Sequence, residues 1–455
     1  MKLDESIVIM MSVTLPIKKQ LNSVSAEKDK LNPVFRNILT KGETSSDTIL
    51  VTERPETPNP PLIRTSNTVL ATEHKTPNSP LLISDTVLFT ERSKAPNSPL
   101  MTTSSDTVLA TERPETPNLP LMTTSSDTVL VTGGAGFLGQ HIVKLLQEKA
   151  DHVKEIKILD MKPYRNILDY KQCKPIQTII GNITDRDTVQ RACNGVTSVY
   201  HVAGLISYGT RNVIDGCVKA GVQRLIYCST VDVAIGYDPI RDGNENNTPP
   251  PKRFLFPGYP ETKYKAECLV LQSNGRTCTL GRKLETLALR VNVLYGEGDP
   301  YYVTTGLKRA YKANGTLYRV GNGQAKFQQA YAGNAAWAFI CADKALRNNL
   351  TPGGTVYYIP DDTPIQNTFD FFQPFLESRQ LRLSKWRIPF CLAYGGLYLF
   401  EVFLHLISPL KKIYFHEASC SVWYICTDLY FKSEKARKIL GYKPLTSPNE
   451  AISSI

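Results

Sequence analysis

SSDTVLVTGGAGFLG, residues 125–139, is the stretch that decides the fold. Its first letters repeat a segment that the chain has already used four times, starting at Ser45, Ser66, Ser84 and Ser104. Only the fifth copy runs into glycines. At the position of Gly133 the earlier copies carry a glutamate: Glu53, Glu73, Glu91 and Glu112. A glutamate side chain would obstruct a tight turn and repel an anion, so only Thr128–Thr132 is expected to open a glycine-rich turn.

The residues around these glycines follow the order strand, turn, helix. TVLVT (128–132) has the composition of a strand, and FLGQHIVKLLQEK (137–149) places Ile142, Leu145 and Leu146 on one helical face. The GxGxxG pattern at 134–139 is weak by itself, because such a stretch is often only a turn. Its setting is more specific, because Asp160 closes the next strand 21 residues after Gly139.

This setting is typical of a dinucleotide site. Glycines let the backbone approach a pyrophosphate at the helix N-terminus, and Asp160 can accept both hydroxyls of the adenine ribose. Asp160 would also repel a 2′-phosphate, so NAD is favoured as the cofactor, with NADP left open by the nearby Lys162. GNIT (181–184) follows the third strand, where Asn182 is a candidate adenine partner. An ordinary strand-end turn explains GNIT equally well.

Apolar runs alternate with helical patterns after Asp127. The expected strands are 128–132, EIKILD (155–160), IQTIIG (176–181), TSVYHVA (197–203), QRLIYCS (223–229) and ETLALRV (285–291). The expected helices are 137–149, DRDTVQRAC (185–193) with Asp185 as cap, RNVIDGCVKAG (211–221) and one starting near Tyr259. Short strands joined by helical crossovers require a parallel sheet covered on both faces. We predict an α/β fold, a doubly wound parallel sheet (Rossmann) with a small C-terminal substrate-binding α/β region.

The first 124 residues form a Thr/Ser/Pro-rich tandem repeat, with units such as DTVLATERPETPNLPLMTT (106–124). A period of about 20 residues can indicate a solenoid. Each unit offers too few apolar side chains to offset the entropy of ordering the chain. We therefore predict a disordered N-terminal extension over 1–124, with a stacked β-repeat or a docking segment with Thr-Pro phosphorylation sites as alternatives, and an NAD-binding domain over 125–455.

Composition excludes several classes of function. The net charge is +11, but Lys and Arg are scattered without a basic run or interleaved aromatic array, so no nucleic acid is expected as a partner. The charge is either a general property of the surface or an attraction to an anionic membrane. The ten cysteines form no CxxC pair and no zinc spacing, so we expect reduced thiols, the cytosolic side and no metal. Asp4 and Glu5 precede the apolar run 7–17, which argues against a secretory signal.

A second motif, Tyr259-Pro-Glu-Thr-Lys263, lies at the start of a predicted helix. The spacing puts both side chains on one helical face, so an ammonium lies near the phenol. The positive charge lowers the pKa of the tyrosine, which ordinarily titrates near 10, and suits it to carry a proton. Ser229 and Thr230 end the fifth strand, where a hydroxyl can hold a substrate oxygen against Tyr259. YxxxK alone also occurs by chance on surfaces.

Together these motifs carry a family resemblance. TGGAGFLG, Asp160, YCSTVDV and YPETK resemble the extended short-chain dehydrogenase/reductase family. HVAGLISYG, RNVIDGCVKAGVQ, LRVNVLYGEGD, YAGNAAWA and YYIPDDTP are similar to its 3β-hydroxysteroid dehydrogenase/Δ5-Δ4-isomerase branch, from about Thr128 onward. The resemblance implies a catalytic set of Tyr259, Lys263, Thr230 and Ser229. The implied cofactor-binding residues are Gly133, Gly136, Phe137, Leu138, Gly139, Asp160, Asn182, Ile183, Tyr259 and Lys263.

By this resemblance the chain is an oxidoreductase that oxidises a 3β-hydroxysteroid with NAD. Tyr259 is the general acid/base, Lys263 orients the nicotinamide ribose, and Thr230 stands where the family has a serine, with Ser229 as a substitute. In isomerase members a proton then moves from C4 to C6. Sterol 4-carboxylate 3-dehydrogenation, another short-chain reductase activity and a catalytically weakened dinucleotide-binding protein are the alternatives.

The chain departs from the family between HVAGLISYGT and RNVIDGCVKAG. Only residues 204–222 link two strands, and the family's relay asparagine and part of its usual dimer surface have no counterpart, Asn212 coming too late in the pattern. A homodimer is therefore expected to be weakened. Twelve helical residues span about 18 Å, close to the length of a strand, so the crossover can still close. Ile214, Cys217 and Val218 are expected to face the sheet.

An apolar segment, Ile388–Leu410, is 23 residues long, enough to cross a bilayer core of about 30 Å. Trp386 and Arg387 precede it and Lys411 and Lys412 follow, as interfacial anchors do. Glu401 argues against a clean span, because a carboxylate there costs about 2.5–3.5 kcal/mol. We expect membrane association, spanning or interfacial, at the cytosolic face of the endoplasmic reticulum. A mitochondrial membrane or a buried hairpin capping the substrate pocket are alternatives.

Overall fold

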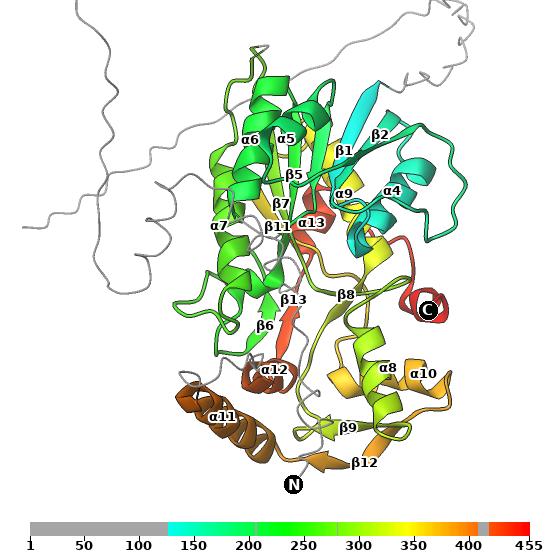
Figure 1. The fold of residues 1–455 in the computed structure, drawn as a ribbon, viewed down its shortest axis with the longest axis vertical. Helices are drawn as coiled ribbons and strands as arrows, with labels where there is room; N and C mark the ends of the chain where they lie inside the picture. Colours follow the sequence, from blue (N-terminus) through cyan, green and yellow to red (C-terminus); the bar gives the residue numbers. More distant parts are fainter. Residues whose placement is uncertain (1–125, 205–206, 280, 408–417) are drawn as a thin grey trace, which may run out of the picture. The chain divides into compact units, whose positions relative to one another are not determined.

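The computed structural model describes residues 126–204, 207–279, 281–407 and 418–455. Its main element is a seven-stranded sheet in which each neighbouring pair is parallel (Figure 1). In spatial order the strands are β3 (Ile176–Ile180), β2 (Val153–Asp160), β1 (Asp127–Thr132), β4 (Ser198–His201), β5 (Arg224–Thr230), β7 (Glu285–Val291) and β11 (Thr355–Tyr358). The predicted doubly wound sheet is confirmed. The predicted disordered extension lies outside the described residues.

Helices cover both faces of this sheet because alternate residues of each strand point to opposite sides. Val129 and Val131 of β1 pack with Ile142 of α4 (Phe137–Lys149) and Phe339 of α9 (Ala332–Arg347). Leu130, between them, packs on the other face. That face is covered by α5 (Arg186–Cys193), α6 (Ser207–Ala220) and α7 (Tyr259–Gln272), as Figure 1 shows. Asp185 caps α5 through Asp187 N, as predicted.

The shortened crossover closes as predicted. Helix α6 runs for 14 residues and returns the chain to β5, which pairs in parallel with β4. Ile214 and Cys217 are fully buried against the sheet, and Val218 packs on the same cluster half-buried. The helix begins four residues before the expected start at 211, which supplies part of the missing length.

The C-terminal part of the chain, together with two inserted segments, forms a second, smaller α/β region. Its strands pair in parallel across long sequence separations: β6 (Ile240–Gly243) with β13 (Leu429–Phe431), β8 (Val293–Tyr295) with β10 (Gln329–Tyr331), and β9 (Thr316–Val320) with β12 (Arg382–Ile388). The helices are α8 (Val303–Lys312), α10 (Thr368–Glu377), α11 (Phe390–Ile407), α12 (Ala418–Ile425), α13 (Glu434–Ile439) and α14 (Pro448–Ser453). An aromatic cluster that includes Tyr295, Tyr302, Phe371 and Phe375 forms its core.

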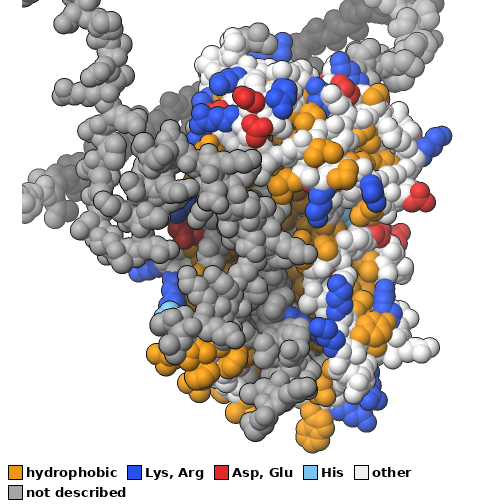
Figure 2. Space-filling view, in the orientation of Figure 1, with side chains coloured by type: hydrophobic (Ala, Val, Ile, Leu, Met, Phe, Trp, Pro, Cys, Tyr) orange, Lys and Arg blue, Asp and Glu red, His pale blue; other side chains and the backbone are white. Residues whose placement is uncertain are grey.

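Helix α11 covers most of the apolar segment, whose last residues, 408–410, lie outside the described part. It is the one helix among the described residues that is long and apolar enough to cross a membrane. Leu397 and Leu404 are buried, whereas Leu392, Leu399 and Leu406 are 69%, 68% and 71% exposed. Hydrophobic side chains accordingly gather over α11 at the lower left of Figure 2. The helix therefore has one face packed on the protein and one apolar face toward solvent.

Candidate active site

The glycine-rich turn lies at the carboxyl end of β1. Gly133 has a φ of +76°, and Gly136 N donates to its carbonyl oxygen at 3.0 Å, which closes the turn before α4 begins. A Cβ added to Gly139 would lie 2.2 Å from the carbonyl oxygen of Gly133, so only glycine permits this close approach. Gly136 caps α4 without a side-chain hydrogen bond. The backbone amides of the first helical turn, from Phe137 and Leu138 onward, are therefore left to an anion.

This turn sits where the strand order reverses, between β1 and β4. A Cβ added to Gly133 would lie 2.8 Å from Ala203 N, just past the end of β4. The next residue, Gly204, lies close to α7, since a Cβ added there would lie 2.6 Å from Lys263 Nζ. Ligands of doubly wound folds bind at the carboxyl ends of strands at this reversal. The residues therefore fit a dinucleotide with its pyrophosphate on α4 and its reactive end toward Lys263.

Asp160 ends β2 beside the glycine turn. Its carboxylate accepts hydrogen bonds from Ala135 N and Lys162 N, both at 3.0 Å, and the side chain stays partly exposed. The position suits the ribose contact predicted for it. The side-chain oxygen of Asn182 accepts a hydrogen bond from Thr184 N at 3.0 Å. This bond belongs to the ordinary strand-end turn of the alternative interpretation. The carbonyl of Ile183 accepts from Asn212 Nδ2 at 3.0 Å, so the adenine contact of this turn stays a prediction.

Tyr259 and Lys263 lie one turn apart at the start of α7. Lys263 is buried, and its ammonium donates to the carbonyl oxygen of Cys228 on β5 at 2.5 Å and lies 4.8 Å from the ring centre of Tyr227. The ammonium is thus held between the ends of β4 and β5. Burial raises the pKa of the half-buried Tyr259 phenol, and the charge of Lys263 opposes that rise. This opposition is the role that the YxxxK spacing predicts for the lysine.

The two hydroxyls at the end of β5 have different surroundings. Thr230 Oγ1 accepts from Asp232 N at 3.2 Å and donates to Asp232 Oδ2 at 3.1 Å, at the start of the short 3-10 helix η3 (Val231–Ala234). Ser229, by contrast, is fully buried and donates to Glu267 Oε2 at 2.5 Å. Glu267 is in turn held by two hydrogen bonds from Arg290, at 2.6 and 3.0 Å. The geometry favours Thr230 as the substrate-holding hydroxyl and gives Ser229 a structural role.

Asp232 and Tyr424 also belong to this site, and sequence reasoning missed both of them. Tyr424 of α12 donates to Asp232 Oδ1 at 3.0 Å, and Tyr259 lies close enough for the Asp232 charge to raise the pKa of its phenol. Burial raises the pKa of Asp232, while the hydrogen bonds from Tyr424 and Thr230 oppose that rise. Asp232 follows Thr230 by two residues, a signal that the sequence did offer. Tyr424 has no comparable signal, because only the tertiary fold brings it to η3.

Known proteins share both the sequence pattern and the fold. The model of the 3-beta hydroxysteroid dehydrogenase/isomerase family matches residues 130–390. The chain belongs to this family. It is similar to the 3 beta-hydroxysteroid dehydrogenase type 7 of Mus musculus, with 33% identity over 70% of this chain and 92% of the relative. The Homo sapiens protein of the same name is 32% identical over 70% and 91%. The chain is accordingly an NAD-dependent oxidoreductase of the dehydrogenase type.

Solved structures share the fold at lower identity. MoeE5 in complex with UDP-glucuronic acid and NAD has a TM-score of 0.52 at 20% identity, over 72% of this chain and 97% of that one. The epimerase Mth375 of Methanothermobacter thermautotrophicus has a TM-score of 0.54 at 17% identity, over 72% and 91%. At these identities the likeness concerns the fold of the dehydrogenase and not its substrate.

Asn212 of α6 is held by hydrogen bonds within the fold. It is buried, and its Nδ2 donates to the carbonyl oxygens of Ile183 and Thr184, both at 3.0 Å. Arg186 Nε donates to its Oδ1 at 3.3 Å. These bonds fix Asn212 as a link between α6 and the turn after β3. That Asn212 lies too late in the pattern to carry protons stays a prediction.

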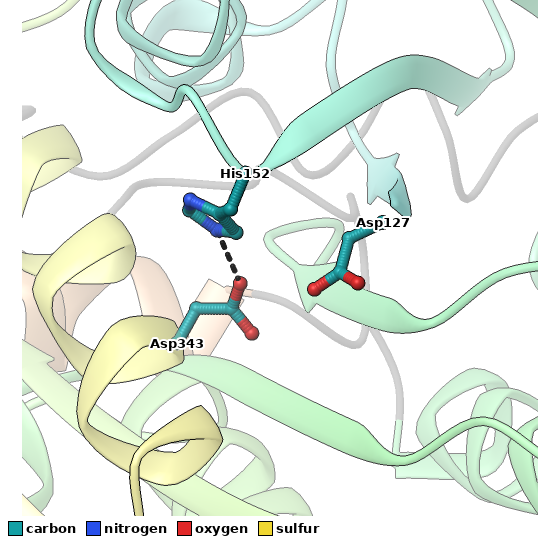
Figure 3. Close-up of side chains that lie close together, drawn as sticks. All are labelled: Asp127, His152 and Asp343. Atoms are coloured by element: carbon teal, nitrogen blue, oxygen red, sulfur yellow. Dashed lines mark hydrogen bonds and ion pairs between the residues drawn. The ribbon is translucent and has the colours of Figure 1, made fainter. Parts of the chain in front are cut away.

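A second group of ionisable side chains lies at the opposite, amino end of the sheet (Figure 3). The ligand atoms of Asp127, His152 and Asp343 lie within 4.8 Å of one another, as in a metal site. Arg224, however, donates to Asp127 at 2.5 Å and to Asp343 at 2.7 Å. Burial alone raises the pKa of Asp343, but the hydrogen bond with His152 and the charge of Arg224 bring it down to about 2. The group is therefore a buried ion-pair network that ties the strand ends together.

Proposed function

We propose that the chain oxidises a 3β-hydroxysteroid to the 3-ketosteroid with NAD. The observation that carries the proposal is the position of the Lys263 ammonium, one helical turn from Tyr259 and beside Gly204 at the strand-order reversal. The glycine-rich turn lies at the same edge of the sheet. The steroid class is supported by the family and by the type 7 relatives.

When bound, NAD supplies the hydride acceptor. The chain's own part in the reaction begins with the phenolate of Tyr259, which takes the proton of the 3β-hydroxyl. Lys263 stabilises that phenolate, because an ammonium nearby offsets the rise in the pKa of Tyr259 that burial causes. Thr230 holds the substrate oxygen, and its hydroxyl turns from Asp232 to the substrate as the alcohol becomes a ketone. Asp160 and the first turn of α4 hold the adenosine and pyrophosphate.

Δ5–Δ4 isomerisation is an extension of this proposal and is supported by the name of the family. It moves a proton from C4 to C6 and so needs a group that gives and takes a proton above the ring. Because isomerisation is supported by the family name alone, we propose oxidation as the principal activity. The ultraviolet absorbance of the conjugated ketone distinguishes the isomerised product from the simple 3-ketone.

We further propose that the enzyme works at a membrane surface on the cytosolic face of the endoplasmic reticulum. The exposed apolar face of α11 supports membrane docking, because a steroid also partitions into lipid. Glu401 accepts from Ser419 N at 2.9 Å and from Ser419 Oγ at 2.5 Å, so its carboxylate is turned to α12 and away from that face. This arrangement favours an interfacial helix over a spanning one. The ten cysteines, which form no CxxC pair, agree with a reducing compartment.

NADH fluorescence tests the proposed reaction directly. The full chain is mixed with NAD and a panel of 3β-hydroxysteroids, including sterols that carry a 4-carboxylate, and the reduced cofactor is followed over time. We expect turnover in the native chain and a loss of about 10²–10⁴-fold in Tyr259→Phe, with NAD binding retained. NAD binding without turnover on any steroid would favour the catalytically weakened binding protein instead.

A further inference from the structure

Arg309, in the C-terminal region, has two guanidinium nitrogens that are buried without a partner among the described residues. The residue lies on α8, and these nitrogens are its Nε and Nη2 atoms. Arg319 and Arg387 also have a buried unpaired nitrogen, but each uses another one, on the carbonyl of Lys385 and on Asp370 respectively. Burial lowers the pKa of Arg309 to about 10, so the guanidinium stays protonated at neutral pH.

Such a group needs a physical explanation. A buried charge is costly unless it is paired, and no carboxylate of the described residues forms an ion pair with Arg309. Replacing it by an apolar side chain would remove that cost. An arginine in this position is understandable if its partner is an oxyanion that arrives with a ligand.

The surroundings of Arg309 define the kind of ligand. Its side chain lines a pocket between α8, β9, α10 and α12, with aromatic walls that include Tyr302, Phe369 and Phe372. The cavity volume is about 40 Å³. A water-sized group needs about 10–15 Å³ by this measure, so the pocket holds about three heavy atoms. A carboxylate has three, and its two oxygens match the planar fork of a guanidinium.

Helix α12 connects this pocket to the catalytic residues. Ser421 and Ile425 line the pocket, whereas Tyr424, on the adjoining face of the same helix, bonds to Asp232 beside Tyr259. The pocket-lining Tyr302 also lies close enough for its charge to affect the pKa of Tyr424. The pocket and the reacting group therefore lie against adjoining faces of the same helix. An elongated, rigid molecule such as a steroid can reach both.

We propose that Arg309 binds a carboxylate carried by the substrate at the end remote from the reacting 3β-hydroxyl. This inference rests on the proposed function and narrows its substrate class to acidic steroids. A carboxylate at C4 would not serve, because it adjoins the reacting carbon and would lie beside Tyr259, which does not line the pocket. The aromatic walls exclude water, so the charge-assisted bond gains strength there.

The test compares a 3β-hydroxysteroid bearing a side-chain carboxylate with its methyl ester, in the native full chain and in Arg309→Met, Arg309→Lys and Lys308→Met. Lys308 is the matched control, since it is the exposed neighbour of Arg309 on α8. We expect the native chain and Lys308→Met to show a KM for the acid about ten- to hundredfold below that for the ester. Arg309→Met should abolish this preference, and Arg309→Lys should restore part of it.

Thermal denaturation gives a readout that does not depend on turnover. Without ligand, Arg309→Met should melt at the same temperature as the native chain or above it, because an unpaired buried charge is removed. The acidic steroid should raise the melting temperature of the native chain and not that of Arg309→Met. This rise in melting temperature would support carboxylate binding even if no steroid is oxidised. In that case the proposed function would fail and the proposed carboxylate site would remain.

Three outcomes would overturn the inference. One is an acid-to-ester ratio that Arg309→Met leaves unchanged. Another is a lower melting temperature of Arg309→Met together with equal stabilisation by acid and ester, which would make Arg309 a structural residue. The third is stabilisation by acetate or phosphate alone with no added effect of the acidic steroid, which would assign the pocket to a free small anion.

Discussion

Tyr424 donates a hydrogen bond to Asp232 across 192 residues of chain, at 3.0 Å. This contact joins a C-terminal helix to the segment that follows Thr230, the proposed substrate-holding residue. It also places a carboxylate near the phenol of Tyr259, opposite in effect to the ammonium of Lys263. The phenol of Tyr259 therefore feels a positive and a negative charge with opposite effects on its pKa. If Tyr259 carries the proton as proposed, the balance of the two charges sets the pH range of the reaction.

Asp232→Asn should shift that balance. Burial raises the pKa of Tyr259, and the Asp232 charge raises it further because a like charge disfavours the phenolate. Oxidation needs the phenolate, so activity is lost as the pH falls below that pKa. Removing the Asp232 charge lowers the pKa, and the acid limb of kcat/KM should move to lower pH by about one unit. Steady-state rates of NADH formation from pH 5 to 10 measure the shift.

Asp370→Asn, at an exposed site on α10, is the charge-matched control and should leave the profile in place. If Asp232→Asn lowers kcat/KM by the same factor at every pH, Asp232 only supports the local fold.

Ser229 and Thr230 at the end of β5 should differ in role. We expect a structural role for the serine and a catalytic role for the threonine. Thr230→Ala should lower kcat by about 10²-fold or more with little loss of stability, because its hydroxyl is the one placed to hold the substrate oxygen. Ser229→Ala should instead lower the free energy of unfolding by about 1–3 kcal/mol, because it leaves the buried Glu267 short of a donor. Urea denaturation and initial rates on both variants check the assignment, which a reversal of the two effects would contradict.

Gly139→Ala should abolish cofactor binding without unfolding the chain. The new Cβ would lie 2.2 Å from the carbonyl oxygen of Gly133, so the turn must open and the amide cradle for the pyrophosphate is lost. Gly396→Ala on α11 is the matched control, because an added Cβ meets nothing within 4 Å there. Titration of NAD by calorimetry should show at least about a tenfold weaker Kd in the first variant only. Equal affinities would mean that the pyrophosphate binds elsewhere.

The nucleotide-binding half was predictable from sequence because its signals are local. The alternation of Val129, Leu130 and Val131 predicts a buried strand, and the glycine spacing predicts the turn after it. The Tyr259 and Lys263 spacing predicts one helical face. Even the shortened crossover could be judged from the length of a helix against that of a strand.

The C-terminal region offered no such signals, because its contacts are set by the tertiary fold. Strand β13 pairs with β6, far earlier in the chain, and neither is long enough to show a period of two. Tyr424 and Arg309 read as ordinary helical residues in sequence. Their roles depend on what surrounds them: Tyr424 meets a carboxylate from η3, and Arg309 meets a pocket whose described lining is aromatic and contains no acid.

The exposed face of α11 gives the last prediction, on membrane binding. Leu399 is 68% exposed and lies opposite the side on which Glu401 is bonded to Ser419. Burying one leucine in lipid contributes about 1.5–3 kcal/mol, so Leu399→Glu should weaken binding to phosphatidylcholine and phosphatidylserine vesicles by at least about tenfold. Leu350→Glu, at a 63% exposed leucine after α9, is the matched control and should bind like the native chain. Vesicle flotation measures the bound fraction, and alkaline carbonate should release the native chain because an interfacial helix does not span the bilayer. Retention in carbonate, or equal binding of both variants, would contradict docking through this face.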